Sequence, residues 1–113
     1  MEARILDVDD LETLLGDWRT HLRARNRSKA TIASYTRCAE AFCGFLVARG
    51  MPTSTAAISR EHVEAFLADL ADRVAPATTA RHYRSLQQLF KWLEEDGEIA
   101  RSPMQRMKPP SQY

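Results

Sequence analysis

Apolar residues recur at three- and four-residue steps along most of the chain, which is the spacing of one face of an α-helix. Four segments show this pattern, and short polar stretches separate them. In order, their apolar positions are Leu11, Leu14, Leu15, Trp18 and Leu22; Ile32, Tyr35, Ala39, Phe42 and Leu46; Val63, Phe66, Leu67 and Leu70; and Leu86, Leu89, Phe90 and Leu93. The pattern predicts four amphipathic helices, each with one face in a hydrophobic core.

Residues that begin and end helices stand at the borders of these segments. The N-cap candidates are, in order, Asp9 or Asp10, Ser28, Ser59, and Thr78 or Thr79. Gly50 with Pro52 and, later, Gly97 are stop signals, because glycine tolerates the left-handed conformation at a helix end. Pro76 is expected to close the turn between the third and fourth helices. The first helix is thus predicted at about residues 10–24.

The residues after Gly97 indicate a short closing segment. Pro103 suits a short fifth turn of helix, and Pro109-Pro110 is typical of an extended linker. No stretch alternates apolar and polar residues with a period of two, so no strand is predicted. We expect an all-α fold of four helices with a short fifth helical element, a domain over residues 1–108 and the start of a linker at 109–113.

The composition narrows the class of protein. The 113 residues have room for one domain, and 44% hydrophobic with 27% charged residues is ordinary for a globular chain. No apolar run approaches the roughly 18 residues of a membrane span, and no apolar signal-peptide stretch is present. The expected location is therefore the cytoplasm, with no membrane partner.

The cysteines and histidines give no sign of a disulfide or a metal site. Cys38 and Cys43 lie on one predicted helix and point in different directions, so they are expected to be reduced. His21, His62 and His82 have no cysteine or histidine three or four residues away to share a metal ion. We predict neither a metal nor a cofactor.

The formal net charge is only +1, but the charges are segregated along the chain. Residues 1–16 carry five acids against Arg4, whereas residues 17–49 carry seven lysines or arginines against two acids. Residues 50–75 are net −2, and the tail from Gly97 onward is net +2. Such segregation allows a local cationic surface despite the small total charge.

Two predicted helices carry polar, cation-rich stripes opposite their apolar faces. The second-helix set is Arg27, Lys29, Thr31, Ser34 and Arg37, and the fourth-helix set is Arg81, Arg84, Ser85, Gln88 and Lys91. Arginine and lysine bind phosphates or guanine edges, glutamine binds adenine edges, and small hydroxyls permit close approach. The stripes predict a surface that binds duplex DNA, and the alternative is two ordinary solvated helix faces.

The tyrosines do not form an active site in this interpretation. A tyrosine can attack a phosphodiester when cations surround it, but Tyr35 and Tyr83 lie on or beside apolar faces and Tyr113 stands in a proline-rich tail. No phosphate loop, carboxylate pair or Ser/His/Asp group stands out. The acids Glu94, Glu95 and Asp96 oppose the dipole of the fourth helix and have no explanation in the sequence.

Specific motifs resemble a known family, the tyrosine recombinases or phage integrases, in their N-terminal core-binding (SAM-like) domain. The matching segments are Ser28-Lys29-Ala30-Thr31-Ile32-Ala33-Ser34-Tyr35 with Phe42 and Phe45-Leu46; Ala77-Thr78-Thr79-Ala80-Arg81-His82-Tyr83-Arg84-Ser85-Leu86 with Leu89-Phe90-Lys91-Trp92-Leu93; and Gly97-Glu98-Ile99-Ala100-Arg101-Ser102-Pro103. Ser102 replaces the asparagine that is usual in the last motif. The resemblance covers about residues 10–110, in the right order and spacing.

The resemblance implies a four-helix orthogonal bundle that forms one arm of a clamp around double-stranded DNA, with the second and fourth helices facing adjacent major grooves. It also implies other recombinase protomers in a DNA-bound tetramer as partners of the parent enzyme. The family's catalytic residues belong to a separate C-terminal domain. We therefore expect this chain to be no enzyme by itself, with no catalytic residue, and its parent to be a tyrosine recombinase.

Two alternatives stay open from the sequence alone. One is a helical protein-interaction module in which exposed Trp92, Met104 and Met107 form a patch for a partner. The other is a stand-alone regulator that occupies recombination sites on DNA and blocks them.

Overall fold

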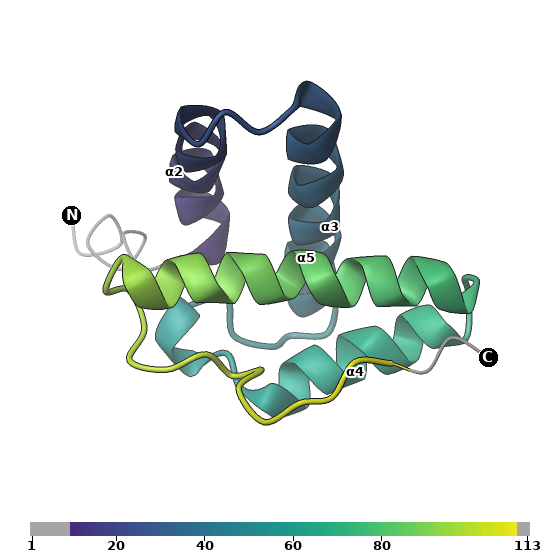
Figure 1. The fold of residues 1–113 in the computed structure, drawn as a ribbon. Helices are drawn as coiled ribbons and strands as arrows, with labels where there is room; N and C mark the ends of the chain where they lie inside the picture. Colours follow the sequence, from purple (N-terminus) through teal and green to yellow (C-terminus); the bar gives the residue numbers. More distant parts are fainter. Residues whose placement is uncertain (1–9, 111–113) are drawn as a thin grey trace. The chain divides into compact units, whose positions relative to one another are not determined.

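The structure is a computed structural model that describes residues 10–110, and in this range it is all-helical, with helices joined by short loops (Figure 1). The chain divides between Ala57 and Ile58 into two compact units, unit 1 and unit 2, each of which is described by itself. Residues 1–9 and the end of the predicted linker, 111–113 with Tyr113, lie outside the described residues.

Unit 1 contains two antiparallel helices, α2 (Leu11–Ala24) and α3 (Lys29–Ala48), that pack side by side (Figure 1). Asp10 is the N-cap of α2, and its carboxylate accepts a hydrogen bond from the Glu12 N–H at 3.1 Å. Ser28 caps α3 in the same way and accepts from the Thr31 N–H at 3.1 Å. Both caps were predicted, because aspartate and serine oxygens satisfy amide groups that a helix start leaves free.

The core of unit 1 is formed by the apolar faces of α2 and α3. The buried residues are Leu11, Leu14, Leu15, Trp18 and Leu22 of α2 with Cys38, Ala39, Phe42, Cys43 and Leu46 of α3. The ring of Trp18 stacks on that of Tyr35, with centroids 5.8 Å apart and planes 2° from parallel. Burial, with nearby carboxylates, raises the pKa of the Cys43 thiol to about 12, and both cysteines are free as predicted.

The segment after α3 returns to the start of α2. Gly50 takes a φ of 67°, which confirms the predicted stop signal. The Leu11 N–H then donates to the Thr53 carbonyl at 2.9 Å, and the Thr53 hydroxyl donates to the Asp10 carboxylate at 2.5 Å. A 3-10 helix, η1 (Thr55–Ala57), follows within the segment predicted as a connector.

Unit 2 begins with α4 (Arg60–Ala71), which packs against α5 (Pro76–Glu95). Ser59 precedes α4 as predicted, and its N–H donates to Nδ1 of His62 at 2.9 Å. The helix α5 begins at Pro76, earlier than the predicted Thr78 or Thr79. Proline suits the first helical position, because its φ is already helical and its missing N–H would have no partner there.

The core of unit 2 lies along one side of each of its helices. The buried residues are Val63, Phe66, Leu67 and Leu70 of α4 with Thr79, Ala80, Tyr83, Ser85, Leu86, Leu89, Phe90, Trp92 and Leu93 of α5. Gly97 ends α5 with a φ of 81°, as its position predicted. Within residues 10–110 there is no strand, only one isolated bridge between Asp10 and Ser54.

The last described segment of unit 2, residues 98–110, packs onto the helix α5. Met104 is 3% exposed, and the Tyr83 hydroxyl donates to the Met107 carbonyl at 3.2 Å. Residues 103–106 form consecutive turns, in which the Gln105 N–H donates to the Ser102 carbonyl. The short fifth helical element predicted near Pro103 is thus formed by hydrogen-bonded turns and is not a regular helix. None of the described helices is long and apolar enough to cross a membrane.

Candidate nucleic-acid interface

The outer side of α5 carries most of the predicted fourth-helix set. Arg81, Arg84, Gln88 and Lys91 are all exposed, and at 100° per residue they fall within an arc of about 80°. We call these four residues the α5 face. They stand opposite the buried positions of the helix, so the hydrophobic period correctly predicted the exposure of these four residues.

Ser85 was predicted to belong to this face, and that prediction was wrong. Its side chain is 2% exposed, and its Oγ is buried without a hydrogen-bond partner. The reason is geometric, because Ser85 lies only about 40° from Leu89 and 20° from Trp92 around the helix. A polar side chain this close to the apolar face is covered by the core.

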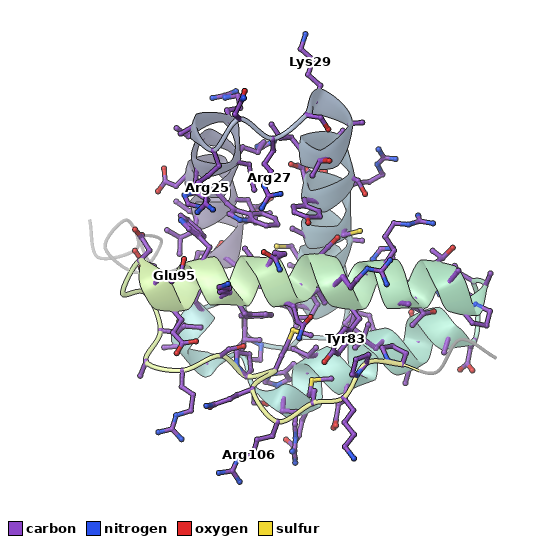
Figure 2. The ribbon with its side chains drawn as sticks, viewed as in Figure 1. Arg25, Arg27, Lys29, Tyr83, Glu95 and Arg106 are labelled. Carbon is purple, nitrogen blue, oxygen red and sulfur yellow. The ribbon has the colours of Figure 1, made fainter. Side chains whose placement is uncertain are left out.

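Within the described part of the chain, no carboxylate forms an ion pair with the cations of the α5 face. Among residues 10–110, Arg81, Arg84 and Lys91 form no ion pair. Glu95 follows Lys91 by one turn and is exposed at the end of α5, where Figure 2 shows it. The face is therefore cationic from Arg81 to Lys91 and ends at this acid.

Glu94, whose presence the sequence left unexplained, has a structural role. Its carboxylate accepts a hydrogen bond from the Ser102 N–H at 3.3 Å. The contact ties the closing segment to the end of α5, so this acid serves the fold of unit 2.

The second-helix set is more scattered than its spacing predicted. Arg27 precedes the N-cap Ser28 and is therefore in the loop before α3, since helical geometry starts only at Lys29. Lys29 extends from the N-terminal end of α3 (Figure 2). Thr31 is half-buried, and its hydroxyl accepts from that of Ser28 at 2.9 Å, so it belongs to the cap. Arg37 is exposed.

Ser34 lies at the border between the buried and the exposed side of α3. Its side chain is half-buried, and its hydroxyl forms no hydrogen bond within the described part of the chain. It remains a candidate contact beside Arg37, which is three residues further along the same helix.

Two arginines of α2 join Lys29 and Arg37 at one open depression of unit 1, which the sequence did not reveal. This cationic depression has a volume of about 510 Å³ and is lined by Arg19, Arg23, Lys29, Ile32, Ala33, Thr36, Arg37 and Glu40. Arg19 is 3.9 Å from Glu40, but both side chains are about half exposed, so the pair is weak. The cations exceed the acids by three in this lining.

A signal for Arg19 and Arg23 existed in the sequence. Each directly follows a core residue of α2, Trp18 or Leu22, and both fall in the cation-rich stretch 17–49. A position beside the core face borders the neighbouring helix. Periodicity along one helix does not predict that α2 packs against α3, so it could not place Arg19 and Arg23 beside Lys29 and Arg37.

The tyrosines in the described part of the chain, Tyr35 and Tyr83, contact core groups and do not stand in a cationic site. Tyr83 is 1% exposed and donates its hydroxyl to a carbonyl, and burial raises its pKa, which disfavours the phenolate that a nucleophile needs. Tyr35 is half-buried against Trp18. Within residues 10–110, no group of three His, Cys, Asp or Glu side chains could hold a metal ion.

The described residues form an all-helical fold, as the resemblance to an integrase N-terminal domain implied, and cations are exposed on its helix faces. Residues 14–98 match the family described as "Phage integrase, N-terminal SAM-like domain", and the chain belongs to this family. The resemblance inferred from the motifs is thus confirmed, and so is the all-α fold class.

Two curated relatives agree with this assignment. The chain is 36% identical over 87 residues to a protein named "Tyrosine recombinase XerC" from Roseiflexus castenholzii, which covers 76% of this chain and 27% of the relative. It is 31% identical over 103 residues to a protein of the same name from Chlorobaculum tepidum, covering 85% of this chain and 31% of the relative. The chain therefore spans less than a third of the length of these relatives. No solved structure matches the chain significantly.

Proposed function

We propose that this chain binds duplex DNA as the N-terminal DNA-binding domain of a site-specific tyrosine recombinase. The observation that carries the proposal is the α5 face, where three cations and Gln88 are exposed and, within the described residues, no carboxylate pairs with the cations. Exposed cations that pair with no carboxylate do not stabilise the fold. A polyanionic partner would form ion pairs with them.

The chemistry of the two units suits DNA in complementary ways. Arg81, Arg84 and Lys91 would bind phosphates or guanine edges, and Gln88 offers the amide that pairs with an adenine edge. In unit 1, Arg23 and Arg37 of the cationic depression would add phosphate contacts. Phosphate contacts should then dominate the affinity, which makes binding depend strongly on salt.

The parent protein would use this domain for affinity and part of its site recognition. Two relatives carry the name of a tyrosine recombinase, and this chain corresponds to less than a third of each. We infer that catalysis belongs to other parts of such a parent, and that other protomers of the same recombinase are partners on DNA.

The alternative, a protein-interaction patch, is not supported, because two of its three residues are buried. It required Trp92 and Met104 to be exposed, but they are only 7% and 3% exposed. Trp92 is one of the buried residues of α5, and Met104 is buried within the turns of residues 103–106. Met107 alone, half-buried, does not form a patch.

Neighbouring residues of α5 provide a matched test. Arg81→Ala with Arg84→Ala should weaken binding of a short DNA duplex about tenfold without unfolding the chain. Ser85→Ala should leave duplex binding unchanged, because that side chain is buried. Fluorescence anisotropy measures the affinity, and circular dichroism checks the fold. A double variant that binds as well as the natural chain would overturn the proposal.

A further inference from the structure

Three arginines of unit 2 gather at a place that the α5 face does not include. Arg60, Arg101 and Arg106 line an open depression of about 240 Å³, together with Ser102, Pro103 and Gln105. We call the three arginines the arginine cluster. No carboxylate is among the lining residues, and the polar groups of Ser102 and Gln105 can donate hydrogen bonds.

The charges of the arginine cluster are available to bind an anion, because within the described residues they are not strongly paired with acids. Arg60 lies 3.9 Å from Glu64, one turn along α4, but both side chains are more than half exposed, and such a pair contributes little. Arg101 and Arg106 are exposed and form no ion pair in the part of the chain that the structure describes. In Figure 2, Arg106 extends outward from the closing segment.

The backbone that carries Arg101 and Arg106 is tied to the end of α5. Met104, between them, is 3% exposed. The Ser102 N–H donates to the Glu94 carboxylate at 3.3 Å, and the Met104 N–H donates to the Ser102 hydroxyl at 3.1 Å. Because these contacts fix the turn, the two guanidinium groups need lose little backbone freedom when they bind a ligand.

We propose that the arginine cluster is a second phosphate-binding site, separate from the α5 face, which takes a backbone phosphate of nucleic acid. Several guanidinium groups and neutral donors around one hollow, with no acid in its lining, match the oxygens of a phosphate. The choice of nucleic acid as its source rests on the proposed function. Free phosphate shares the chemistry, and the experiment separates the two sources.

The test compares Arg106→Gln with Arg73→Gln in the 113-residue chain. Both changes remove one positive charge from unit 2, but Arg73 is paired with Asp69 at 2.8 Å and lines neither the cationic depression nor the hollow of the arginine cluster. Arg106→Gln should weaken binding of a short DNA duplex about twofold to fivefold, and Arg73→Gln should not. Arg106→Lys should restore part of the loss, because a point charge still attracts phosphate.

NMR of the arginine side-chain Nε–H groups identifies the ligand directly. Added duplex should shift the signals of Arg101 and Arg106, also in a chain whose α5 face carries Arg81→Ala and Arg84→Ala. Those shifts support the arginine cluster even if the α5 face fails its own test, so the two failures are distinguishable. Shifts with inorganic phosphate at equal concentration but not with duplex would overturn nucleic acid as the source. No shift with either, or shifts only with a glutamate-rich peptide, would overturn the site.

Discussion

The ring of His82 is half-buried in unit 2 and meets Phe66 edge-on, with centroids 5.8 Å apart. Its Nδ1 is buried and has no hydrogen-bond partner in the structure. Burial lowers the pKa of His82 below its ordinary value of 6.5, and the charges of Arg81 and Arg73 lower it further. The folded chain therefore holds a proton on this ring less tightly than the unfolded chain does.

This difference predicts a loss of stability in mild acid. Well above pH 6.5 the ring is neutral in both states, and as the pH falls through this value the unfolded state takes up the proton first. The free energy of unfolding should therefore decrease on acidification, and His82→Gln should reduce that decrease. Urea unfolding at neutral and mildly acidic pH measures it. An equal decrease in both proteins would contradict the prediction.

Single residues also mark where sequence reasoning about the site failed. Ser85 looked like a surface contact, yet it is buried, because residues at the border of an amphipathic helix are covered or exposed according to the neighbour that packs there. Thr31 looked like a contact too, and it instead completes the cap of α3. The four residues of the α5 face are exposed as expected, since they lie furthest from the core, and their contact with DNA stays a prediction.

At the scale of elements, the helix starts and stops were mostly predictable. Asp10, Ser28 and Ser59 cap helices, and Gly50 and Gly97 end them, because each acts through local backbone chemistry. The arginines of α2 at the cationic depression were not predictable as a site. Their role depends on packing against α3, which links residues far apart in the sequence.

Two glycines of similar surroundings should respond in opposite ways to alanine. A Cβ at Gly97 or at Gly44 would meet no atom within 4 Å, but Gly97 has a φ of 81°. Gly97→Ala should destabilise the chain by about 1–2 kcal/mol, because alanine is strained in the left-handed region. Gly44→Ala, inside α3, should stabilise it by about 0.5–1 kcal/mol. Denaturation midpoints measure both, and the same sign for both would contradict the argument.

At the scale of the whole molecule, a formal charge of +1 conceals local surfaces rich in cations. The α5 face, the cationic depression and the arginine cluster each gather cations that are distant in the sequence or one turn apart. Total charge is thus a poor guide to where cations gather on this chain, whereas the cation-rich stretch 17–49 supplies the lysine and the arginines of the cationic depression.

The salt dependence of binding should count the phosphate contacts. Removing one contact by Arg84→Gln should flatten the slope of log K against log salt concentration by about 0.9. Arg73→Gln removes the same charge from a residue that is paired with Asp69, and it should leave the slope unchanged. Anisotropy titrations over a salt series give both slopes. Equal slopes for the two variants would show that only net charge matters.

The buried thiol of Cys43 is an intrinsic probe of how often unit 1 opens. With a pKa of about 12 and 8% exposure, it offers almost no thiolate to an alkylating reagent while the helices stay packed. Modification must wait until α2 and α3 separate, so the labelling rate at neutral pH reports how often that half of the chain opens. A reagent that follows unit 1 alone can then tell whether bound DNA tightens it.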